Sequence, residues 1–388
     1  MERATTPTAK IIFRPGPEYA EAKRLWQGCP SLCRTPAGTL YGGWYTGGTR
    51  EPAPENYNLL VRSDDGGFTW SRHPLLVVAA DYSRRKISYD NRLWLDPAGR
   101  MWLFWAERDC TVRRSDPRNC STFAIRCDEP DAPEMKWSEP RFITSGFLGC
   151  KPTVLSDGRW LLPAYDWTCD RYSWCESSDN GESFRRRTGG RKVGTPFDEG
   201  MFYETADGAE IRLLIRSAAG YIAESVSRDG GKTWTDGASS GITAPDSKLY
   251  VRRLRSGRLL LIRNDHASER DRLTAQLSED DGRTWPWKLL LDDGCNVSYP
   301  DAEQLEDGDI VALYDHGRNG FKEIVAARFN ETDILHQRSL KDDTYTRSFL
   351  KHIVSKPPVP IRGVYEKLWN ETQAWVEKQF EFWDAPEP

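Results

Sequence analysis

Short apolar runs recur along this chain in pairs, and a tight turn containing glycine separates the two members of each pair. In one pair, Tyr250-Val-Arg-Arg-Leu254 precedes the turn Ser256-Gly257, and Leu259-Leu-Leu-Ile262 follows it. Apolar runs of this length, bounded by glycine turns, are typical of strands joined in a hairpin. The hairpin occurs six times, with its turn glycine at positions 38, 99, 158, 208, 257 and 308.

A second motif recurs farther along the units and predicts another turn. Ser227-Arg-Asp-Gly-Gly-Lys-Thr-Trp234 has the pattern Ser-x-Asp-x-Gly-x-Thr-Trp, which residues 63–70 and 278–285 repeat. Residues 177–184 keep the aspartate and glycine but end in Ser-Phe, and the segment around Asp128 indicates an eroded fifth copy. In such a turn, the carboxylate can accept backbone N–H groups, glycine supplies a positive φ and tryptophan anchors the turn.

Four strands that recur with a period of about 50 residues are typical of a β-propeller. Six hairpins predict an all-β fold, a six-bladed β-propeller over residues 11–335. The sixth unit lacks the aspartate motif, so we expect the N-terminal strand at residues 10–14 to close its blade. Residues 336–388 form a C-terminal extension outside the repeat. Within it, residues 365–380 have apolar side chains at helical spacing and predict one amphipathic helix, which could also mediate oligomerisation.

Composition agrees with a protein rich in strands and turns. The chain has 12% aromatic residues, 16 Trp, 31 Gly and 24 Pro, which favours an aromatic β protein over a helical bundle. A net charge of −4 gives no bias toward nucleic acid or a membrane surface. Because the chain has no apolar leader and no long apolar run, we expect a soluble, cytoplasmic protein. The nine cysteines lack zinc-type spacing and no Gly-rich phosphate loop occurs, so we expect no metal and no cofactor.

Candidate chemistry lies just before each inner strand and just after each inner hairpin. In a propeller these segments converge on the axis, so each blade is expected to contribute one or two residues to a site. Arginine, tyrosine and carboxylate side chains are dense there, although any one of them could instead belong to a charged surface loop. The residues expected to bind a substrate at this end include Asn56, Tyr57, Asp90, Arg92, Arg253, His266, Asp301 and Arg318.

These features together resemble the sialidase superfamily, whose six-bladed propellers carry aspartate-box turns. The resemblance implies a carboxylate bound by three arginines, a tyrosine nucleophile with a glutamate beside it, and an acid/base aspartate. The glutamate that precedes an inner hairpin turn matches Glu199, and the arginine that ends that hairpin matches Arg216. The arginine before the last aspartate box matches Arg272, and the tyrosine that opens the final inner strand matches Tyr299. A phenol beside a carboxylate suits attack on an oxocarbenium-like centre, and guanidinium groups suit a bidentate clamp on a carboxylate.

The sequence departs from the family at two positions. Family members begin the first inner strand with Arg-Ile-Pro, whereas this chain has Gly28-Cys-Pro30, so the first arginine is missing. The following loop has no clear acid aspartate, and its carboxylates Glu51 and Glu55 make Glu51 the acid/base candidate. An incomplete triad argues against ordinary N-acetylneuraminic acid and favours another acidic sugar such as a uronic acid. Arg253 or Arg92 would then supply the replacement cation.

Three functions remain open from the sequence. The first is an exo-acting, sialidase-like glycoside hydrolase on an acidic or unusual terminal sugar of an oligosaccharide. The second is a lyase specific for uronate oligosaccharides or polysaccharides, in which Tyr299, His266 or His316 acts as a base. The third is a carbohydrate-binding propeller without catalysis, because the fold alone does not decide the chemistry.

Overall fold

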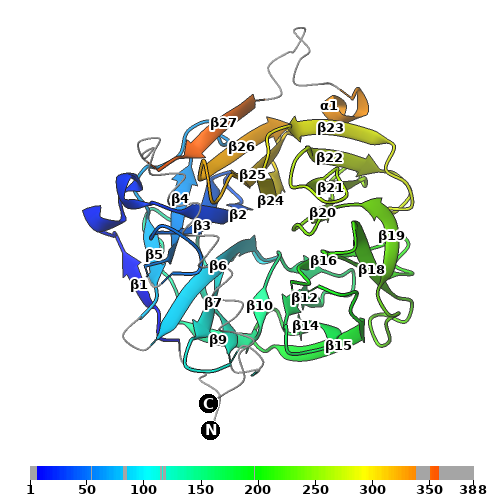
Figure 1. Ribbon diagram of the computed structural model, residues 1–388, viewed down its shortest axis with the longest axis horizontal. Coiled ribbons are helices and arrows are strands. Elements are labelled where there is room, and N and C mark those ends of the chain that lie inside the picture. Colours follow the sequence, from blue (N-terminus) through cyan, green and yellow to red (C-terminus); the bar gives the residue numbers. More distant parts are fainter. Residues whose placement is uncertain are drawn as a thin grey trace.

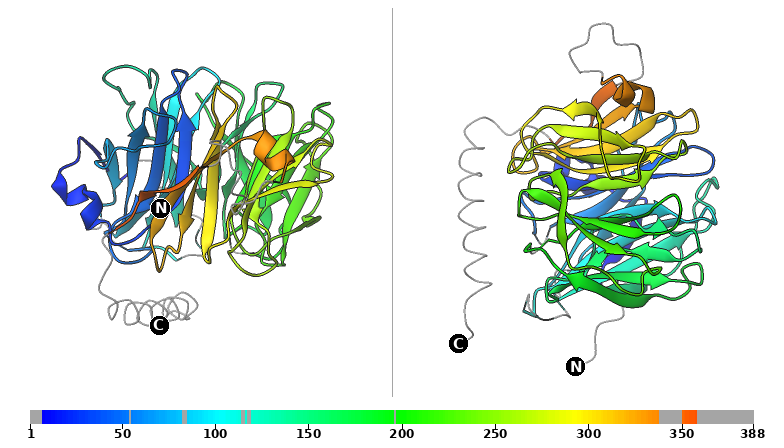
Figure 2. Two further views of the ribbon diagram at one scale, coloured as in Figure 1. Left: turned by 90° about the horizontal axis from the view of Figure 1, so that it is seen from above. Right: turned by 90° about the vertical axis from the view of Figure 1, so that its right-hand side faces the viewer.

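The computed structural model describes residues 7–53, 55–81, 85–113, 116, 119–195, 197–337 and 350–357. Six blades of antiparallel β-sheet are arranged around a central axis (Figure 1). Seen from the side, the strands run between two faces of a disc (Figure 2). The predicted six-bladed, all-β propeller is therefore confirmed. In the described part of the chain, no helix is long and apolar enough to cross a membrane.

Each blade is built outward from the axis by consecutive strands. The innermost strands are β2 (Gln27–Arg34), β6 (Lys86–Leu95), β11 (Thr153–Val154), β16 (Gly200–Glu204), β20 (Tyr250–Arg253) and β24 (Val297–Gln304). Their hairpin partners are β3 (Leu40–Thr46), β7 (Met101–Asp109), β12 (Trp160–Leu162), β17 (Ile211–Ile215), β21 (Leu259–Asn264) and β25 (Ile310–His316). In blade three, β10 (Phe147–Leu148) and β13 (Ala164–Tyr165) form a separate two-stranded continuation of this hairpin.

Two further strands complete each blade. The third strands are β4 (Tyr57–Ser63), β8 (Cys120–Cys127), β14 (Arg171–Ser177), β18 (Tyr221–Ser227), β22 (Leu273–Ser278) and β26 (Glu323–Phe329). The outer strands are β5 (Leu76–Ala79), β9 (Arg141–Ser145), β15 (Arg185–Arg191), β19 (Ala238–Thr243), β23 (Trp287–Asp292) and β27 (Leu350–Ser355). Apolar side chains pack between adjacent blades. Trp94 of blade two, for example, meets Trp160 of blade three with 4.8 Å between ring centroids.

Blade six closes differently from the prediction. The N-terminal strand β1 (Lys10–Phe13) pairs with β5, so it adds a fifth strand to blade one. Blade six is completed by β27, which pairs with β26 and places Ile353 opposite Val325. Because β27 lies outside the repeat and has no aspartate box before it, the periodic pattern did not reveal it. The propeller thus extends past the predicted boundary at residue 335, through the short helix α1 (Glu331–Leu335) to β27. The helix predicted at residues 365–380 lies outside the described residues.

The aspartate boxes are turns between the third and outer strands. In the copy at residues 227–234, Asp229 accepts hydrogen bonds from the Ser227 hydroxyl at 2.9 Å, the Thr233 N–H at 2.9 Å and the Thr233 hydroxyl at 2.6 Å. The bonds from Thr233 lower the pKa of Asp229 to about 2. Trp234 packs on Trp174 of the preceding blade, with 5.1 Å between ring centroids. Each box therefore fixes a turn and fastens neighbouring sheets.

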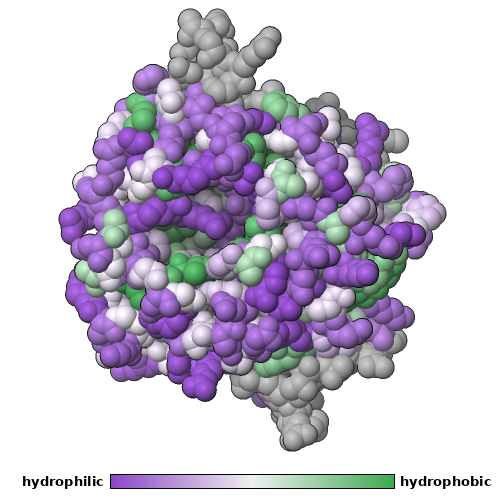
Figure 3. Space-filling view, turned by 180° about the vertical axis from the view of Figure 1, so that it is seen from behind, coloured by the Kyte–Doolittle hydropathy of each residue, from purple (hydrophilic) through white to green (hydrophobic). Residues whose placement is uncertain are grey.

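Three inner strands carry a bulge near their first residues. The pairing register shifts at Cys29 in β2, Asp90 in β6 and Tyr299 in β24, and these residues have φ of 56°, 49° and 55°. A residue with positive φ in a strand re-aims the local backbone, and such bulges concentrate at functional rims. The bulges thus lie toward the first residues of the inner strands, and the hairpin turns follow the last residues of these strands at the opposite end. The face turned away in Figure 1 is largely hydrophilic and is hollowed near its centre (Figure 3).

Candidate active site

Tyr299, Glu199 and Arg216 meet where inner strands of blades four and six begin. The Tyr299 hydroxyl donates a hydrogen bond to Glu199 Oε2 at 3.1 Å. Arg216 Nη1 donates to the same carboxylate oxygen at 2.7 Å and to the Tyr299 oxygen at 3.1 Å. All three side chains are buried, with Glu199 only 1% exposed. The structure therefore brings together three residues that the sequence singled out in two different blades.

The electrostatic setting keeps the phenol of Tyr299 neutral at ordinary pH. Burial raises its pKa well above 10, the nearby charge of Glu199 raises it further, and Arg216 and Arg318 act in the opposite direction. A neutral phenol needs a base to remove its proton as it attacks, and Glu199 is within hydrogen-bonding distance to do so. The pair has the geometry of a nucleophile activated by an adjacent carboxylate.

Three guanidinium groups surround Tyr299. Arg318 lies 4.5 Å from the ring centroid and Arg270 lies 5.7 Å from it, while Arg216 bonds its hydroxyl. Burial, together with the charges of Arg318 and Arg216, lowers the pKa of Arg270. Arg270 donates to the main-chain oxygen of Asp246 at 2.7 Å and forms no ion pair with a carboxylate among the described residues. The site therefore has a guanidinium group available to bind an anion.

The sequence selected Arg272 as the second arginine, but the structure places Arg270 at the site. The Arg272 side chain is 51% exposed, and its nearest carboxylate is that of Asp271 at 3.6 Å. Both arginines lie in the loop before β22, and the alternation of the strand does not extend into this loop. Spacing from the aspartate box therefore could not distinguish two positions that are only two residues apart. Arg270 is the site residue that sequence reasoning missed.

Two carboxylates lie on the blade-one and blade-two side. Glu51 accepts one hydrogen bond from the Tyr45 hydroxyl at 2.5 Å and forms an ion pair with Arg318 at 2.9 Å. Asp90 stands on the bulge of β6, and its side chain has no hydrogen bond to any residue that the structure describes. Burial raises the pKa of Asp90 to about 6, Arg92 opposes the shift, and Glu199 and Glu51 add to it. Either carboxylate could exchange a proton with a bound glycoside.

Several predicted binding residues have structural partners instead. Asn56 is buried and bonds main-chain atoms of its own loop, including Ala53 N at 2.6 Å. Arg92 is fully buried and donates to the main-chain oxygen of Gly149 at 2.7 Å, so it underlies the site. Asp301 accepts from Ser31 and Leu32 of blade one and forms an ion pair with the buried Lys151 at 3.2 Å.

Three more predicted residues point elsewhere. Tyr57 packs edge-on against Tyr19, with 4.9 Å between ring centroids, on the outer side of blade one. His266 accepts N–H bonds from its own loop, at 2.8 Å from Glu269. Arg253 lies at the far end of β20 and donates to Asp281, so it does not replace a cation near Tyr299.

Aromatic rings pack together on the blade-two and blade-three side of the site, where Phe147 and Tyr165 are buried and Trp167 and Phe197 are partly buried. Phe147 lies between Tyr89, Tyr165 and Trp167, with centroid distances of 5.3, 5.1 and 4.3 Å. The row continues through Phe197, over whose ring Arg216 is placed at 5.0 Å. Aromatic faces suit the apolar side of a sugar ring or an acyl substituent. The site thus combines a cationic half from blades four to six with an aromatic half.

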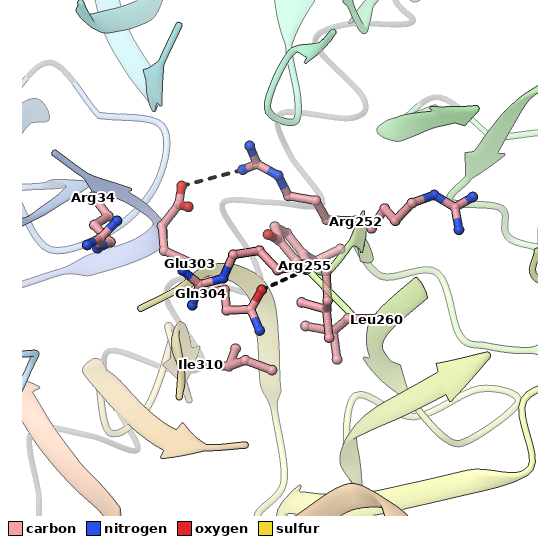
Figure 4. A pocket seen from close by; sticks show the side chains of 10 residues that line it. Arg34, Arg252, Arg255, Leu260, Glu303, Gln304 and Ile310 are labelled. Carbon is pink, nitrogen blue, oxygen red and sulfur yellow. Dashed lines mark hydrogen bonds and ion pairs between the residues drawn. The ribbon is translucent and has the colours of Figure 1, made fainter. Parts of the chain in front are cut away.

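A pocket lies at the other end of the inner strands, near the hairpin turns of blades five and six (Figure 4). Its volume is about 240 Å³, and it contains several arginine side chains. Arg252 faces Glu303 at 3.6 Å, and Arg255 pairs with Glu306 at 3.2 Å. Carboxylates therefore compensate the charges of these two arginines. In the described part of the chain, no cluster of three His, Cys, Asp or Glu side chains could hold a metal ion.

Sequence comparison links the chain to a known domain family. Residues 38–312 match the family described as BNR repeat-like domain. A protein named sialidase from Micromonospora viridifaciens is 31% identical over 332 residues, which cover 74% of this chain. The matched region is 49% of that relative, so the chain spans about half the length of the curated protein that it matches.

Solved structures share the fold. The Hadza microbial sialidase Hz136 superposes with a TM-score of 0.63 at 20% identity, covering 76% of this chain and 64% of that one. The intramolecular trans-sialidase from Ruminococcus gnavus has a TM-score of 0.65 at 16% identity, covering 84% and 98%. The leech intramolecular trans-sialidase has a TM-score of 0.66 at 16% identity, covering 86% and 72%. At these identities the likeness concerns the fold.

Proposed function

We propose, from the premise that this chain belongs to the sialidase superfamily of BNR-repeat propellers, that it is an exo-glycosidase acting on a terminal acidic sugar. One observation carries the proposal. The Tyr299 hydroxyl is hydrogen-bonded to Glu199 at 3.1 Å and is surrounded by Arg216, Arg270 and Arg318. A nucleophile and base beside a cluster of guanidinium groups fit a sugar that carries a carboxylate.

The first step would form a glycosyl–tyrosine. The guanidinium groups hold the substrate carboxylate and place the anomeric carbon next to Tyr299. As the phenolic oxygen bonds to that carbon, Glu199 accepts the phenolic proton and the glycosidic C–O bond breaks. The departing oxygen takes a proton from an acid, for which we propose Glu51. The leaving alcohol then departs with its proton.

The second step would release the sugar. Glu51, now a carboxylate, accepts a proton from water while the water oxygen bonds to the anomeric carbon. The bond to Tyr299 breaks, and Glu199 returns the proton to the phenolate. Two displacements at one carbon give overall retention of configuration.

A lyase receives less support from the geometry. Among the described residues, neither His266 nor His316 contacts Tyr299. His316 instead pairs with Glu323 at 2.9 Å and stacks near Phe321, with 4.8 Å between ring centroids. A lyase base would have to reach the proton beside the uronate carboxylate, and these imidazoles are engaged elsewhere.

A substrate screen tests the function directly. Purified protein is incubated with aryl glycosides of N-acetylneuraminic acid, glucuronic acid and neutral sugars, and released phenol is measured. We expect release from an acidic glycoside and none from the neutral ones. An unsaturated uronate product would identify a lyase, and binding of acidic sugars without turnover would identify a lectin-like propeller.

The acid/base assignment has its own test. The Glu51→Gln variant should lose roughly 10²- to 10⁴-fold in kcat on an oligosaccharide and far less on an aryl glycoside, whose leaving group needs little protonation. The Asp90→Asn variant is the matched control and should affect both substrates by the same factor. The reverse pattern would assign the acid role to Asp90.

A further inference from the structure

Gly28, where the sequence lacks the family's arginine, is occupied in space by another arginine. A Cβ atom built on Gly28 would lie 2.3 Å from Cδ and 2.7 Å from Cγ of Arg318. It would also lie 3.2 Å from Oδ2 of Asp315. The φ of Gly28 is not in the left-handed region, so its backbone does not itself require glycine. The feature that excludes a side chain at position 28 is therefore the aliphatic arm of Arg318.

Arg318 reaches this space from the opposite end of the chain. It follows β25 in blade six, and its Nε lies 3.4 Å from Asp315 Oδ2. Asp315 is fully buried and is itself fixed by the Cys29 N–H at 2.9 Å and by the Ser298 hydroxyl at 2.7 Å. The root of the arm is thus anchored at the junction of blades six and one.

The tip of Arg318 lies in the site. Its Nη1 contacts Glu51 at 2.9 Å and Cys29 Sγ at 3.1 Å, and its guanidinium group covers the Tyr299 ring at 4.5 Å. Its Nη2 forms no hydrogen bond to any residue that the structure describes. A guanidinium group has five N–H donors in a planar fork, so it can hold Glu51 and a ligand carboxylate together.

We infer that Arg318 supplies from blade six the cation that is missing at Gly28, and that with Arg216 and Arg270 it completes the site for the substrate carboxylate. The inference rests on the proposed function and makes Gly28 and Arg318 a matched pair. Arg318 forms ion pairs with Glu51 and with buried Asp315. Its guanidinium group therefore approaches the site from blade six, whereas an arginine at position 28 would approach from blade one. We therefore expect the carboxylate to be recognised in an orientation that this arm determines.

Variants at both positions test the inference, with kcat and KM measured on the acidic aryl glycoside that the wild type cleaves. Arg318→Met keeps the aliphatic arm but removes the charge, and it should raise KM roughly 10- to 100-fold, the size of a lost charged hydrogen bond. Arg318→Lys should recover part of this loss. Arg159→Ala, which removes an ion-paired arginine at the inner hairpin turn of blade three, at the end of the strands away from Tyr299, should leave KM unchanged.

The dependence of position 28 on position 318 is tested by moving the arginine from one position to the other. Gly28→Arg alone should impair the enzyme, because the new side chain meets Arg318. Combined with Arg318→Ala, it should raise kcat/KM at least about 10-fold above Arg318→Ala alone, since a charged hydrogen bond is restored. Equal kcat/KM in the double and single variants, with melting temperatures like the wild type, would overturn the matched pair.

Failure of the inference can be told from failure of the proposed function. If the wild type is active and Arg318→Met has an unchanged KM, Arg318 is not part of the carboxylate site and the glycosidase proposal stands. If the wild type cleaves no glycoside, the proposed function fails. The inference is then judged by calorimetric binding of free N-acetylneuraminate and glucuronate. Arg318→Met must weaken this binding as Arg216→Met does. The inference is overturned if the wild type binds neither sugar acid, or if Arg318→Met binds them as tightly as the wild type does.

Discussion

The hydroxyl of Tyr299 is a weak nucleophile while it keeps its proton, and its surroundings hold that proton firmly. Burial is the main cause of its raised pKa, and the charge of Glu199 adds to it. In the proposed reaction, attack therefore requires that Glu199 accept the proton during bond formation rather than before it. The hydrogen bond of 3.1 Å between the two side chains provides this path.

Removing this hydroxyl should stop the chemistry and leave binding in place. We expect Tyr299→Phe to lower kcat by at least about 10³-fold with a small change in KM, because the lost group acts on the reacting carbon. Tyr250→Phe is a matched control. It also removes a buried hydroxyl, one that donates from the first residue of β20 to the Ala302 carbonyl of β24 at 2.8 Å. Full activity in Tyr299→Phe would exclude this nucleophile.

Asp90 connects the site to stability. Its pKa rises from 3.8 to about 6 on folding, so the folded protein holds a proton that the unfolded chain releases. The stability linked to this proton is fully present below pH 4 and is lost as the pH rises through about 6. The asparagine in Asp90→Asn does not titrate, so this variant does not lose the proton-linked stability as the pH rises. In denaturant unfolding, the variant should become more stable than the wild type as the pH rises from 4 to 8, by at most about 3 kcal/mol. A pH-independent difference would contradict the raised pKa.

At the scale of the elements, the aspartate boxes stabilise the blades without touching the site. In the copy before β23, Asp280 accepts from the Ser278 hydroxyl at 2.8 Å, the Thr284 N–H at 2.9 Å and the Thr284 hydroxyl at 2.6 Å. These bonds outweigh the opposing effect of burial and lower the pKa of Asp280 to about 2. The ionised carboxylate therefore contributes stability above pH 3.8 that is lost as the pH falls toward 2.

Deleting this carboxylate should weaken the fold and spare the chemistry. We expect Asp280→Ala to lower the free energy of unfolding by about 1–3 kcal/mol at pH 7, with kcat and KM unchanged at a temperature where the variant is folded. The difference from the wild type should shrink as the pH falls toward 2. Asp128→Ala in the eroded copy is the control. Among the residues that the structure describes, its exposed carboxylate bonds to Arg126 alone, so the change should stay within about 0.5 kcal/mol.

The elements with a strict period could be predicted from the sequence, and those without one could not. Glu199, Arg216 and Tyr299 lie at defined places on inner hairpins, so their convergence followed once the propeller was recognised. Arg270 stands in a loop where no alternation fixes the side-chain direction, and Arg272 looked equivalent to it. The arm of Arg318 crosses between blades six and one, a contact between residues almost 300 positions apart that no local pattern encodes.

At the scale of the whole molecule, the ring gives each side of the site a different character. Blades four, five and six contribute Arg216, Arg270 and Arg318, while Phe147 and Trp167 of blade three belong to the aromatic row. A ring can hold this arrangement only if its last blade stays joined to its first, because the site draws on both. Glu51 of blade one and Arg318 of blade six meet across that junction at 2.9 Å.

Strand β27 is the element that secures this junction. It is the outer strand of blade six, and its last residue, Ser355, donates to Gln27 Oε1 of β2 at 3.1 Å. Val354 packs against the apolar clusters of blades one and six. Without β27, β26 would become an exposed edge with unpaired N–H and C=O groups, and the contact between first and last blades would weaken.

A pair of truncations isolates this strand. A chain that ends at residue 357 keeps β27, and a chain that ends at residue 337 lacks it. The shorter chain should unfold at a lower temperature and associate through the edge of β26, which differential scanning calorimetry and light scattering would detect. Because Arg318 approaches Gly28 across the same junction, the shorter chain should also lose affinity for the acidic substrate while its remaining blades are folded. Equal melting temperatures for the two chains would show that the packing of β24, β25 and β26 against β2 of blade one closes the ring without β27.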